Sequence, residues 1–274
     1  MPSWNIHIAQ TERLLAEDGA VAELVRDRNA FLFGNVVPDI YVGYMVPGIA
    51  HPIPYRVTHF AKPEPIPKPG ERAFWDAYVA PLAEEASLDA DTPVPIVTIV
   101  DERQRLNRVH YPRKYEGNVP YRELTPEEEA AAGAVDVASI RRSVLDLVLG
   151  AWAHLLADNL WNTRVNEYLD AHGGKPGEEF RIKKQGDFDW FGREQQIVSV
   201  PVASERLLRA AAAFPQYPIE ERVALETVGV IHEIVRTNGG GFQHPPYRLL
   251  TEEFFLETFA EVVTATDRAV AERL

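Results

Sequence analysis

Two side chains in one apolar segment have the spacing needed to bind a common ligand. His154 and Asp158 are four residues apart in the most apolar stretch of the chain, and residues at i and i+4 lie on one helix face about 5–6 Å apart. An imidazole and a carboxylate in that position can bind one metal ion. An arginine, or a direct His–Asp pair, would also satisfy two such buried groups. The pair therefore allows a metal site without requiring one.

Three further residues could ligate a metal. His7 lies at the start of an N-terminal helical segment, Asp39 ends an apolar stretch, and His59 lies in a proline-rich loop. Each also has an ordinary structural explanation, since a carboxylate after proline commonly caps a helix or belongs to a turn. The two histidines could equally be a surface residue and a loop residue bonded to the backbone. Composition and periodicity alone indicate a helical protein that could bind metal.

The elements that must position these residues are predicted to be mainly helical. Apolar residues recur at three- and four-residue steps over long stretches, and Ser/Thr caps, acidic first turns and terminal glycines mark several boundaries. The predicted helices cover 5–28 (with a break at Gly19), a segment starting at Thr125, 135–169, 219–236 and a segment starting at Thr251.

Two stretches are predicted to be long irregular loops. Prolines crowd residues 47–69, which favours a rigid loop, and residues 172–191 are rich in Gly, Lys and Asp. Only residues 94–100 have a β-like pattern. No composition shift or repeat divides the chain. We therefore expect an all-α fold, a single multi-helix domain over residues 1–274 with long irregular loops.

Composition excludes several classes of protein and site. The chain has 274 residues, 46% of them hydrophobic and 25% charged, which is typical of a globular protein. The absence of cysteine excludes disulfides, thiolate metal sites and cysteine nucleophiles. A net charge of −13 argues against nucleic acid as a partner. With no secretory signal and no apolar run of membrane-spanning length, we expect a cytoplasmic location and no membrane span.

Four motifs resemble, in their order along the chain, the bacterial zinc-dependent phospholipase C family, and its cytoplasmic branch in particular. The resemblance covers residues 1 to about 165 and fades afterwards. The motifs are Pro2–Ala9, Phe31–Ile40, Thr58–Phe60 and Gly150–Asp158.

The resemblance implies a fold of the phospholipase C / single-strand nuclease type with metal ions held among the helices. It implies that Asp39, His59, His154 and Asp158 bind one zinc ion, and that His7 binds a neighbouring ion with Asp158 bridging the two. A further ion of the family uses a His three residues before a Glu, and no such pair follows Asp158. We therefore expect one or two ions of Zn2+, while Mn2+ and Fe2+ suit the same ligands.

Two groups of polar residues outside the motifs are candidates for contact with a substrate phosphate. A stretch at 183–192 combines lysines with two aspartates, although a turn-rich loop anchored by aromatic residues explains it as well. A histidine and an arginine four apart share a face of the predicted helix 219–236, and an interface histidine is an equal alternative. The candidates are Lys183, Lys184, Asp187, Asp189, His232 and Arg236.

The expected function is a metal-dependent hydrolase of phosphoric esters, similar to phospholipase C, that uses metal-activated water. Its substrate would be a small phosphoester or a lipid headgroup, and Asp39 could act as a base as well as a ligand. One alternative is a catalytically inactive, metal-stabilised scaffold or ligand-binding protein, because four protein ligands usually close a zinc site. Another is a metal-free helical protein. The oligomeric state stays open.

Overall fold

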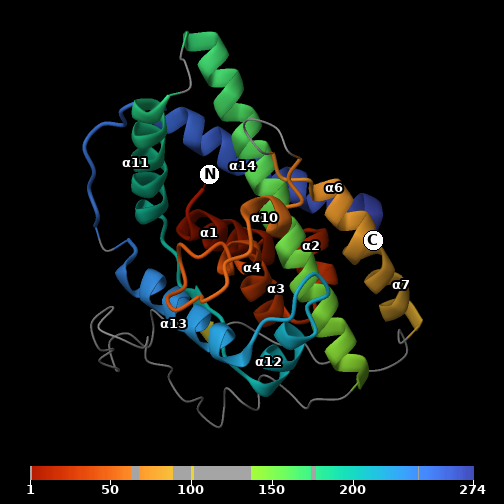
Figure 1. The fold of residues 1–274 in the computed structure, drawn as a ribbon. Coiled ribbons are helices and arrows are strands. Elements are labelled where there is room, and N and C mark those ends of the chain that lie inside the picture. The colour runs from red at the N-terminus through yellow and green to blue at the C-terminus, as the bar shows by residue number, and fades with distance from the viewer. Residues whose placement is uncertain (1, 63–67, 89–99, 102–136, 174–176, 240) are drawn as a thin grey trace.

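A 36-residue helix, α10 (Val137–His172), crosses the molecule from end to end (Figure 1). The computed structural model describes residues 2–62, 68–88, 100–101, 137–173, 177–239 and 241–274. Helices predominate there, and the sheet consists of two antiparallel two-residue strands, β1 (Val100–Asp101) and β2 (Ser199–Val200). The prediction of a mainly helical protein is therefore confirmed.

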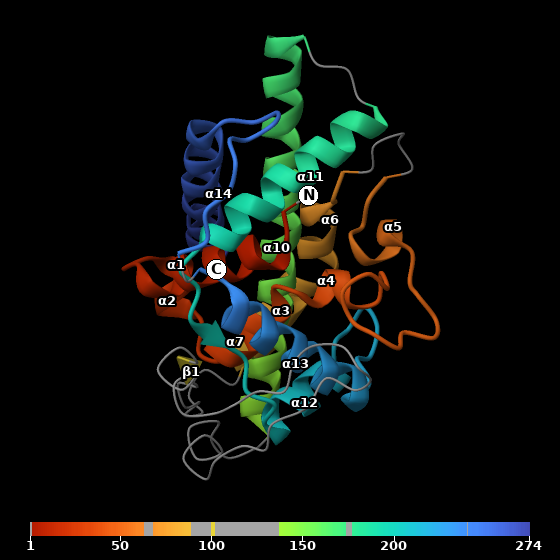
Figure 2. The same cartoon turned by 90° about the vertical axis from the view of Figure 1, so that its left-hand side faces the viewer.

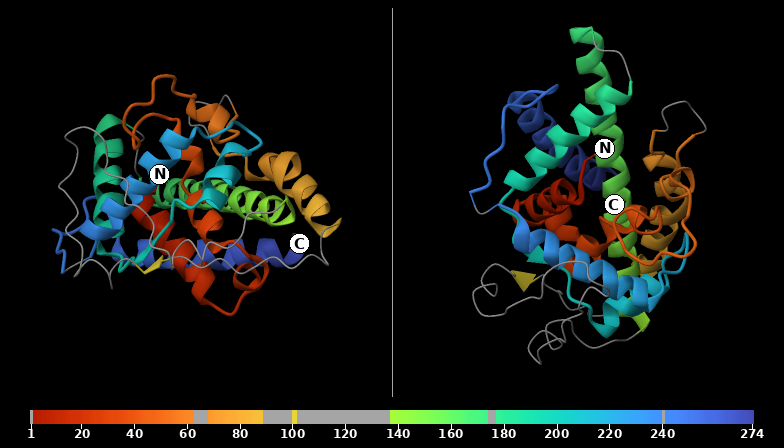
Figure 3. Two further views of the ribbon diagram at one scale, coloured as in Figure 1. Left: turned by 90° about the horizontal axis from the view of Figure 1, so that it is seen from below. Right: turned by 60° about the vertical axis from the view of Figure 1, so that its left-hand side comes forward.

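Helices from both halves of the chain surround α10. It contacts α3, α4, α6 and α7 from the first half and α12 and α14 from the second (Figures 2 and 3). In the described residues, the helices besides α10 are α1 (Trp4–Ala16), α2 (Ala20–Leu24), α3 (Arg28–Gly34), α4 (Val37–Ile40), α5 (Tyr55–Thr58), α6 (Glu71–Phe74), the π-helical turn η1 (Trp75–Val79), α7 (Ala80–Leu88), α11 (Glu178–Glu194), α12 (Glu205–Ala212), α13 (Glu221–Thr237) and α14 (Glu252–Arg273).

The crossing of α3 and α10 is unusually close because glycine occupies the contact on both helices. A Cβ atom on Gly34 would lie 2.0 Å from the carbonyl oxygen of Leu147, and one on Gly150 would lie 2.2 Å from that of Phe31. Only glycine permits this approach of the two backbones. Around the crossing, the side chains of α3 and the middle of α10 form the main apolar core.

Most of the predicted helices are present near their predicted bounds. The N-terminal helical segment divides into α1 and α2 on either side of residues 17–19, as the glycine there predicted. Helix α14 begins after Thr251, whose side chain accepts a hydrogen bond from the backbone N–H of Phe254 at 3.1 Å. Helix α13 ends at Thr237, before the glycine-rich turn. These boundaries follow from caps and breakers that act locally.

The prediction of an irregular loop over residues 172–191 is wrong. Helix α11 covers most of this stretch despite its two internal glycines. Its side chains Phe188 and Phe191 are buried in a second apolar cluster, where they contact Trp161 of α10 and Phe255 of α14. Burial of these rings outweighs a helix-propensity cost of about 1 kcal/mol for each glycine.

The other predicted loop is interrupted by helix. Residues 55–58 of the proline-rich stretch form α5, so the prediction of an irregular segment over 47–69 is partly wrong. Of the β-like stretch, only Val100 lies in the described part, within β1, and the helix start expected at Thr125 lies outside the described residues. In the part of the chain that the structure describes, no helix is long and apolar enough to cross a membrane.

Candidate metal centre

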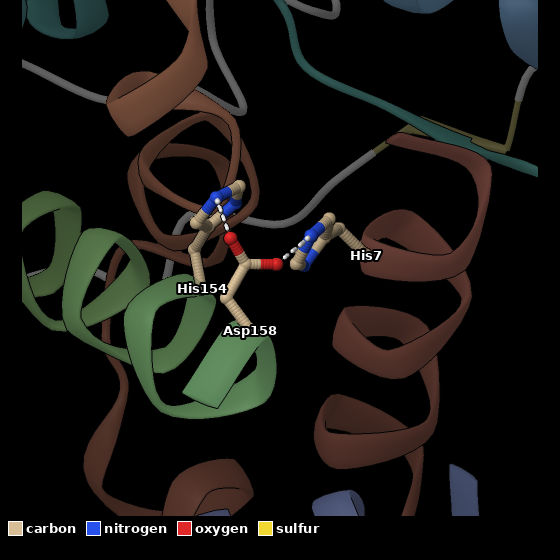
Figure 4. Close-up of side chains that lie close together, drawn as sticks. All are labelled: His7, His154 and Asp158. Carbon is tan, nitrogen blue, oxygen red and sulfur yellow. Dashed lines mark ion pairs between the residues drawn. The ribbon is translucent and has the colours of Figure 1, made fainter. Parts of the chain in front are cut away.

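Five residues from four separate segments meet beside the middle of α10. They come from α1, α4, the residue after α5, and α10 itself. Figure 4 shows the carboxylate of Asp158 between the rings of His7 and His154, with one oxygen directed to each. The five residues are those that the sequence analysis named as metal ligands: His7, Asp39, His59, His154 and Asp158.

His59 and His154 each lie within 3.3–3.8 Å of one another and of carboxylate oxygens of Asp39 and Asp158. The Nε2 atoms of His59 and His154 lie 3.3 Å apart. His59 Nε2 lies 3.5 Å from Asp39 Oδ1 and 3.6 Å from Asp158 Oδ2. His154 Nε2 lies 3.8 Å from Asp39 Oδ2 and 3.6 Å from Asp158 Oδ2. These separations exceed the 2.7–3.2 Å of ordinary hydrogen bonds. Zinc–ligand distances of about 2.0–2.2 Å give tetrahedral edges of about 3.3–3.6 Å. Four of the five distances lie in this range, and the fifth, 3.8 Å to Asp39 Oδ2, slightly exceeds it.

Hydrogen bonds fix which ring nitrogen of His59 and of His154 faces this cluster. His154 Nδ1 lies 2.8 Å from the carbonyl oxygen of Asn35, which can only accept, so Nδ1 carries the proton. The hydroxyl of Thr58 donates to the carbonyl oxygen of Tyr55 at 3.2 Å and therefore accepts from His59 Nδ1 at 2.8 Å. In the neutral rings, both Nε2 atoms are then unprotonated, with lone pairs available to a cation.

His7 occupies the other side of Asp158. Its Nε2 lies 3.4 Å from Asp158 Oδ1, while the second oxygen of the same carboxylate faces the other two histidines. The ring stacks on His154 with centroids 3.9 Å apart, and neither of its nitrogens has a hydrogen-bond partner among the described residues. A carboxylate shared in this way could bridge two ions, one of them bound by His7.

Burial disfavours charge on every member of the cluster. His7, His59, His154 and Asp158 are almost fully buried. Burial lowers the pKa of His7 to about 4 and lowers the pKa of His59 and His154. It raises the pKa of Asp39 and Asp158. Neutral imidazoles and carboxylates are the ligand forms of these groups, and a bound cation would offset the cost of burying the carboxylates.

Solvent reaches the cluster at Asp39. Its side chain is 19% exposed, whereas that of His59 is fully buried. The indole Nε1 of Trp4 donates a hydrogen bond to Asp39 Oδ2 at 3.0 Å, and the ring of Tyr55 stacks on His59 with centroids 3.8 Å apart. Burial, together with the charges of Asp158 and Asp39, raises the pKa of the Tyr55 hydroxyl. Asp39 is therefore the most exposed of the five candidate ligands.

The supporting residues were only partly visible in the sequence. Thr58 precedes His59, and Trp4 lies three residues before His7, so both belong to motifs already singled out. Their contacts with the ligands depend on the tertiary structure. Asn35 acts through its backbone oxygen, and a side-chain pattern gives no signal for such a contact.

The two lysines proposed for substrate binding differ in their surroundings. Lys183 forms an ion pair with Glu179, one turn earlier on α11, at 2.6 Å. Burial lowers the pKa of Lys184, and the charge of Asp158 opposes this effect. The ammonium group of Lys184 is therefore within electrostatic range of the metal-ligand cluster, while that of Lys183 already has a carboxylate partner.

The other four residues proposed for substrate binding all form hydrogen bonds or ion pairs with other groups of the protein. Asp187 is fully buried and accepts hydrogen bonds from the backbone N–H groups of residues 248–250 at 2.8–3.0 Å. Asp189 accepts one from Gln185 at 3.0 Å. His232 Nε2 donates to the carbonyl oxygen of Pro201 at 3.0 Å. Arg236 forms a two-pronged ion pair with Glu233 on α13. Asp187 thus anchors the segment that leads into α14.

Comparison of the chain with models of protein families, with characterised proteins and with solved structures gives no match.

Proposed function

We propose that this protein is a metal-dependent hydrolase of phosphoric esters, similar to phospholipase C, with a zinc ion held by Asp39, His59, His154 and Asp158. The fold proposed with it is of the phospholipase C / single-strand nuclease type, and the location is cytoplasmic. The observation that carries the proposal is the approach of two unprotonated Nε2 atoms to 3.3 Å, with two carboxylates at 3.5–3.8 Å. Such lone pairs repel one another unless a cation lies among them.

The same distances disfavour a metal-free internal His–Asp pair. A hydrogen-bonded imidazole and carboxylate would approach to about 2.7–3.2 Å, whereas His154 Nε2 and Asp158 Oδ2 lie 3.6 Å apart. The two oxygens of Asp158 would instead bind different ions, because Oδ2 faces His59 and His154 while Oδ1 lies 3.4 Å from His7 Nε2. A second ion would bind there.

Bound zinc lowers the pKa of a water ligand to about 7 and offsets negative charge on a phosphoryl group. The residues of the chain would orient and protect the reacting groups. Asp39, the partly exposed ligand, could accept a proton at its carboxylate. Lys184 would bring positive charge to the side of Asp158 and so favour an anionic substrate there. Because the histidines are buried, solvent would reach the centre from the side of Asp39.

Metal content of the full-length protein tests the ligand assignment. After zinc addition and dialysis, we expect at least one ion per chain in the wild type and none at the main position in His154→Ala. His7→Ala should lose only a second ion. His172→Ala is the matched control, because this exposed histidine ends the same helix and bonds Tyr168. Absence of zinc from the wild type would overturn the assignment.

A variant that fails to fold would also lose metal, so Asp158→Asn is measured alongside His154→Ala. Circular dichroism of both variants separates loss of ligand from loss of helix. Folded variants that keep a full complement of zinc would contradict the ligand set.

Hydrolysis distinguishes the enzyme from an inactive metal-stabilised scaffold, which the burial of three of the four ligands favours. The zinc-loaded protein is assayed on bis(4-nitrophenyl) phosphate and on short-chain phospholipids. We expect hydrolysis that a chelator abolishes and that His154→Ala lacks. Stoichiometric zinc with no hydrolysis of either substrate would support the scaffold and overturn the hydrolase.

A further inference from the structure

A cavity of about 560 Å³ is lined by residues that adjoin two of the candidate metal ligands in sequence. Its walls come from the residues after His59, from the start of α6 and from the middle of α10. Phe60, which lines it, directly follows His59, and Asn159, which also lines it, directly follows Asp158. Its volume is within the roughly 300–1,000 Å³ of small-molecule sites. None of the five candidate ligands is among the residues that line the cavity, and the connection between the two runs through these neighbouring residues.

Hydrogen bonds fasten the cavity wall to the cluster. The backbone N–H of Gly70 donates to the carbonyl oxygen of His59 at 3.0 Å. The side-chain amide of Asn159 donates to the carbonyl oxygen of Pro69 at 2.9 Å and to Glu71 Oε2 at 2.9 Å. A Cβ atom on Gly70 would lie 2.4 Å from the carbonyl oxygen of Phe60. The wall is therefore held in place by α10 and by the segment that carries His59.

Three cationic side chains line this cavity: Lys62, Lys68 and Arg72. None of them has an ion pair or a hydrogen bond within the part of the chain that the structure describes. Two acidic residues also line it, and Glu71 is already bonded to Asn159. Free cations gathered at one cavity are notable in a chain with 28 basic and 41 acidic residues. They are available to an anion.

We propose that this cavity binds an anionic group, a phosphate or a carboxylate, of the substrate. The substrate class would then be a small phosphoester with a second anionic group, whose ester lies at the metal centre while the other group lies among Lys62, Lys68 and Arg72. This assignment rests on the proposed function for its link to hydrolysis. Charge-assisted hydrogen bonds, including the fork of an arginine, are the contacts that favour such a ligand.

Anion binding is tested without the metal or the reaction. Inorganic phosphate is titrated by calorimetry into the full-length protein in the presence of a chelator. We expect binding that weakens with added salt and a Kd at least 10-fold higher in the Lys62→Ala/Lys68→Ala/Arg72→Ala variant. Arg72→Ala alone should weaken binding several-fold. Arg268→Ala, which removes an exposed arginine of α14, is the matched control and should leave the Kd unchanged.

A second arm asks whether the anion belongs to the substrate. With zinc, kcat/KM is compared for bis(4-nitrophenyl) phosphate and for a phosphodiester whose leaving alcohol carries a phosphate monoester. We expect the triple variant to lose at least 10-fold on the second substrate and less than 2-fold on the first. Equal losses on both, with phosphate binding intact in the wild type, would mean a separate anion site and overturn the substrate assignment.

The two arms separate this inference from the proposed function. Phosphate binding that depends on the three cations, in a protein that hydrolyses nothing, would support the anion site and overturn the hydrolase. The same Kd in the wild type and the triple variant, or no binding by the wild type at millimolar phosphate, would overturn the anion site whatever the hydrolysis assay gives. Thermal melting of the triple variant confirms that it is folded.

Discussion

A single hydroxyl group decides how His59 can bind a metal. Because the Thr58 hydroxyl donates to Tyr55 and accepts from His59 Nδ1, it leaves Nε2 free of a proton. Thr58 itself is fully buried, so its hydroxyl is out of contact with bulk solvent. Residues that fix ligand tautomers in this way commonly contribute 10–100-fold to metal affinity.

Thr58→Val is nearly isosteric and removes the hydroxyl together with its hydrogen bonds to Tyr55 and His59. We expect the Kd for zinc to rise about 10–100-fold, as measured by competition with a chromophoric chelator. Thr163→Val is the matched control, because the hydroxyl of Thr163 bonds a carbonyl of its own helix. An unchanged zinc affinity in Thr58→Val would show that Thr58 does not orient the ligand.

Asp146 contributes to stability in a pH-dependent way. It is fully buried on α10 and accepts hydrogen bonds from the backbone N–H groups of Arg26 at 3.1 Å and Asp27 at 2.7 Å. Burial raises its pKa from 3.8 to about 6, although Arg142 opposes the shift. The folded protein therefore binds the proton more tightly than the unfolded chain does. Protonation of Asp146 therefore stabilises the folded state. This contribution to the free energy of unfolding is full below about pH 4 and is lost as the pH rises through 6.

The Asp146→Asn variant isolates this effect in the metal-free protein. Its free energy of unfolding, relative to that of the wild type, should rise between pH 4 and pH 6 by up to about 3 kcal/mol. Urea denaturation at several pH values measures the difference. The internal control is the range above pH 7, where the difference in free energy of unfolding between the variant and the wild type should no longer change with pH. A difference that falls as the pH rises from 4 to 6 would contradict the raised pKa of Asp146.

At the scale of the helices, the close crossing of α3 and α10 at Gly34 and Gly150 positions the candidate metal centre. It holds the carbonyl oxygen of Asn35, which follows α3, against His154 Nδ1 on α10. The main chains meet so closely that a methyl group on either glycine would overlap a carbonyl oxygen of the other helix. The orientation of this candidate metal ligand therefore depends on the packing of two backbones.

Gly150→Ala should separate the two helices. We expect a loss of about 1–3 kcal/mol in the free energy of unfolding, from overpacking, and weaker zinc binding. Gly186→Ala is the contrasting control, because nothing lies within 4 Å of a Cβ atom there, inside α11. It should raise stability by up to about 1 kcal/mol. Chemical denaturation measures both, and equal effects of the two substitutions would contradict the close crossing.

Across the molecule as a whole, a metal ion would connect distant parts of the chain. The candidate ligands lie between residues 7 and 158, on four segments that are far apart in the sequence. Because the unfolded chain cannot present these ligands together, binding free energy adds to folding free energy.

Removal of metal should therefore lower thermal stability. With free zinc at 1,000 times the Kd, the expected contribution is about 4 kcal/mol, so a chelator should decrease Tm by several degrees. Differential scanning calorimetry measures the change. His154→Ala should melt at the same temperature with and without chelator. A wild-type Tm that does not respond to the chelator would show that no metal is bound.

Local sequence patterns were sufficient to predict the long helices and to place His154 and Asp158 on one face of α10. Periodicity, caps and glycine breaks act between near neighbours, so α1, α10, α13 and α14 could be predicted. The five candidate ligands were also named from residue types and motif order. Their assignment to metal stays a proposal, although the structure brings their ligand atoms together.

Helix α11, the histidine tautomers and the cationic cavity became apparent only in the folded chain. Residues 178–194 are helical because Phe188 and Phe191 are buried between α10 and α14, an effect that no local propensity contains. The hydrogen bonds of His59 and His154, and the gathering of Lys62, Lys68 and Arg72, depend on segments that approach one another in space. Burial and contact between distant residues are properties of the packed chain, which a local pattern cannot encode.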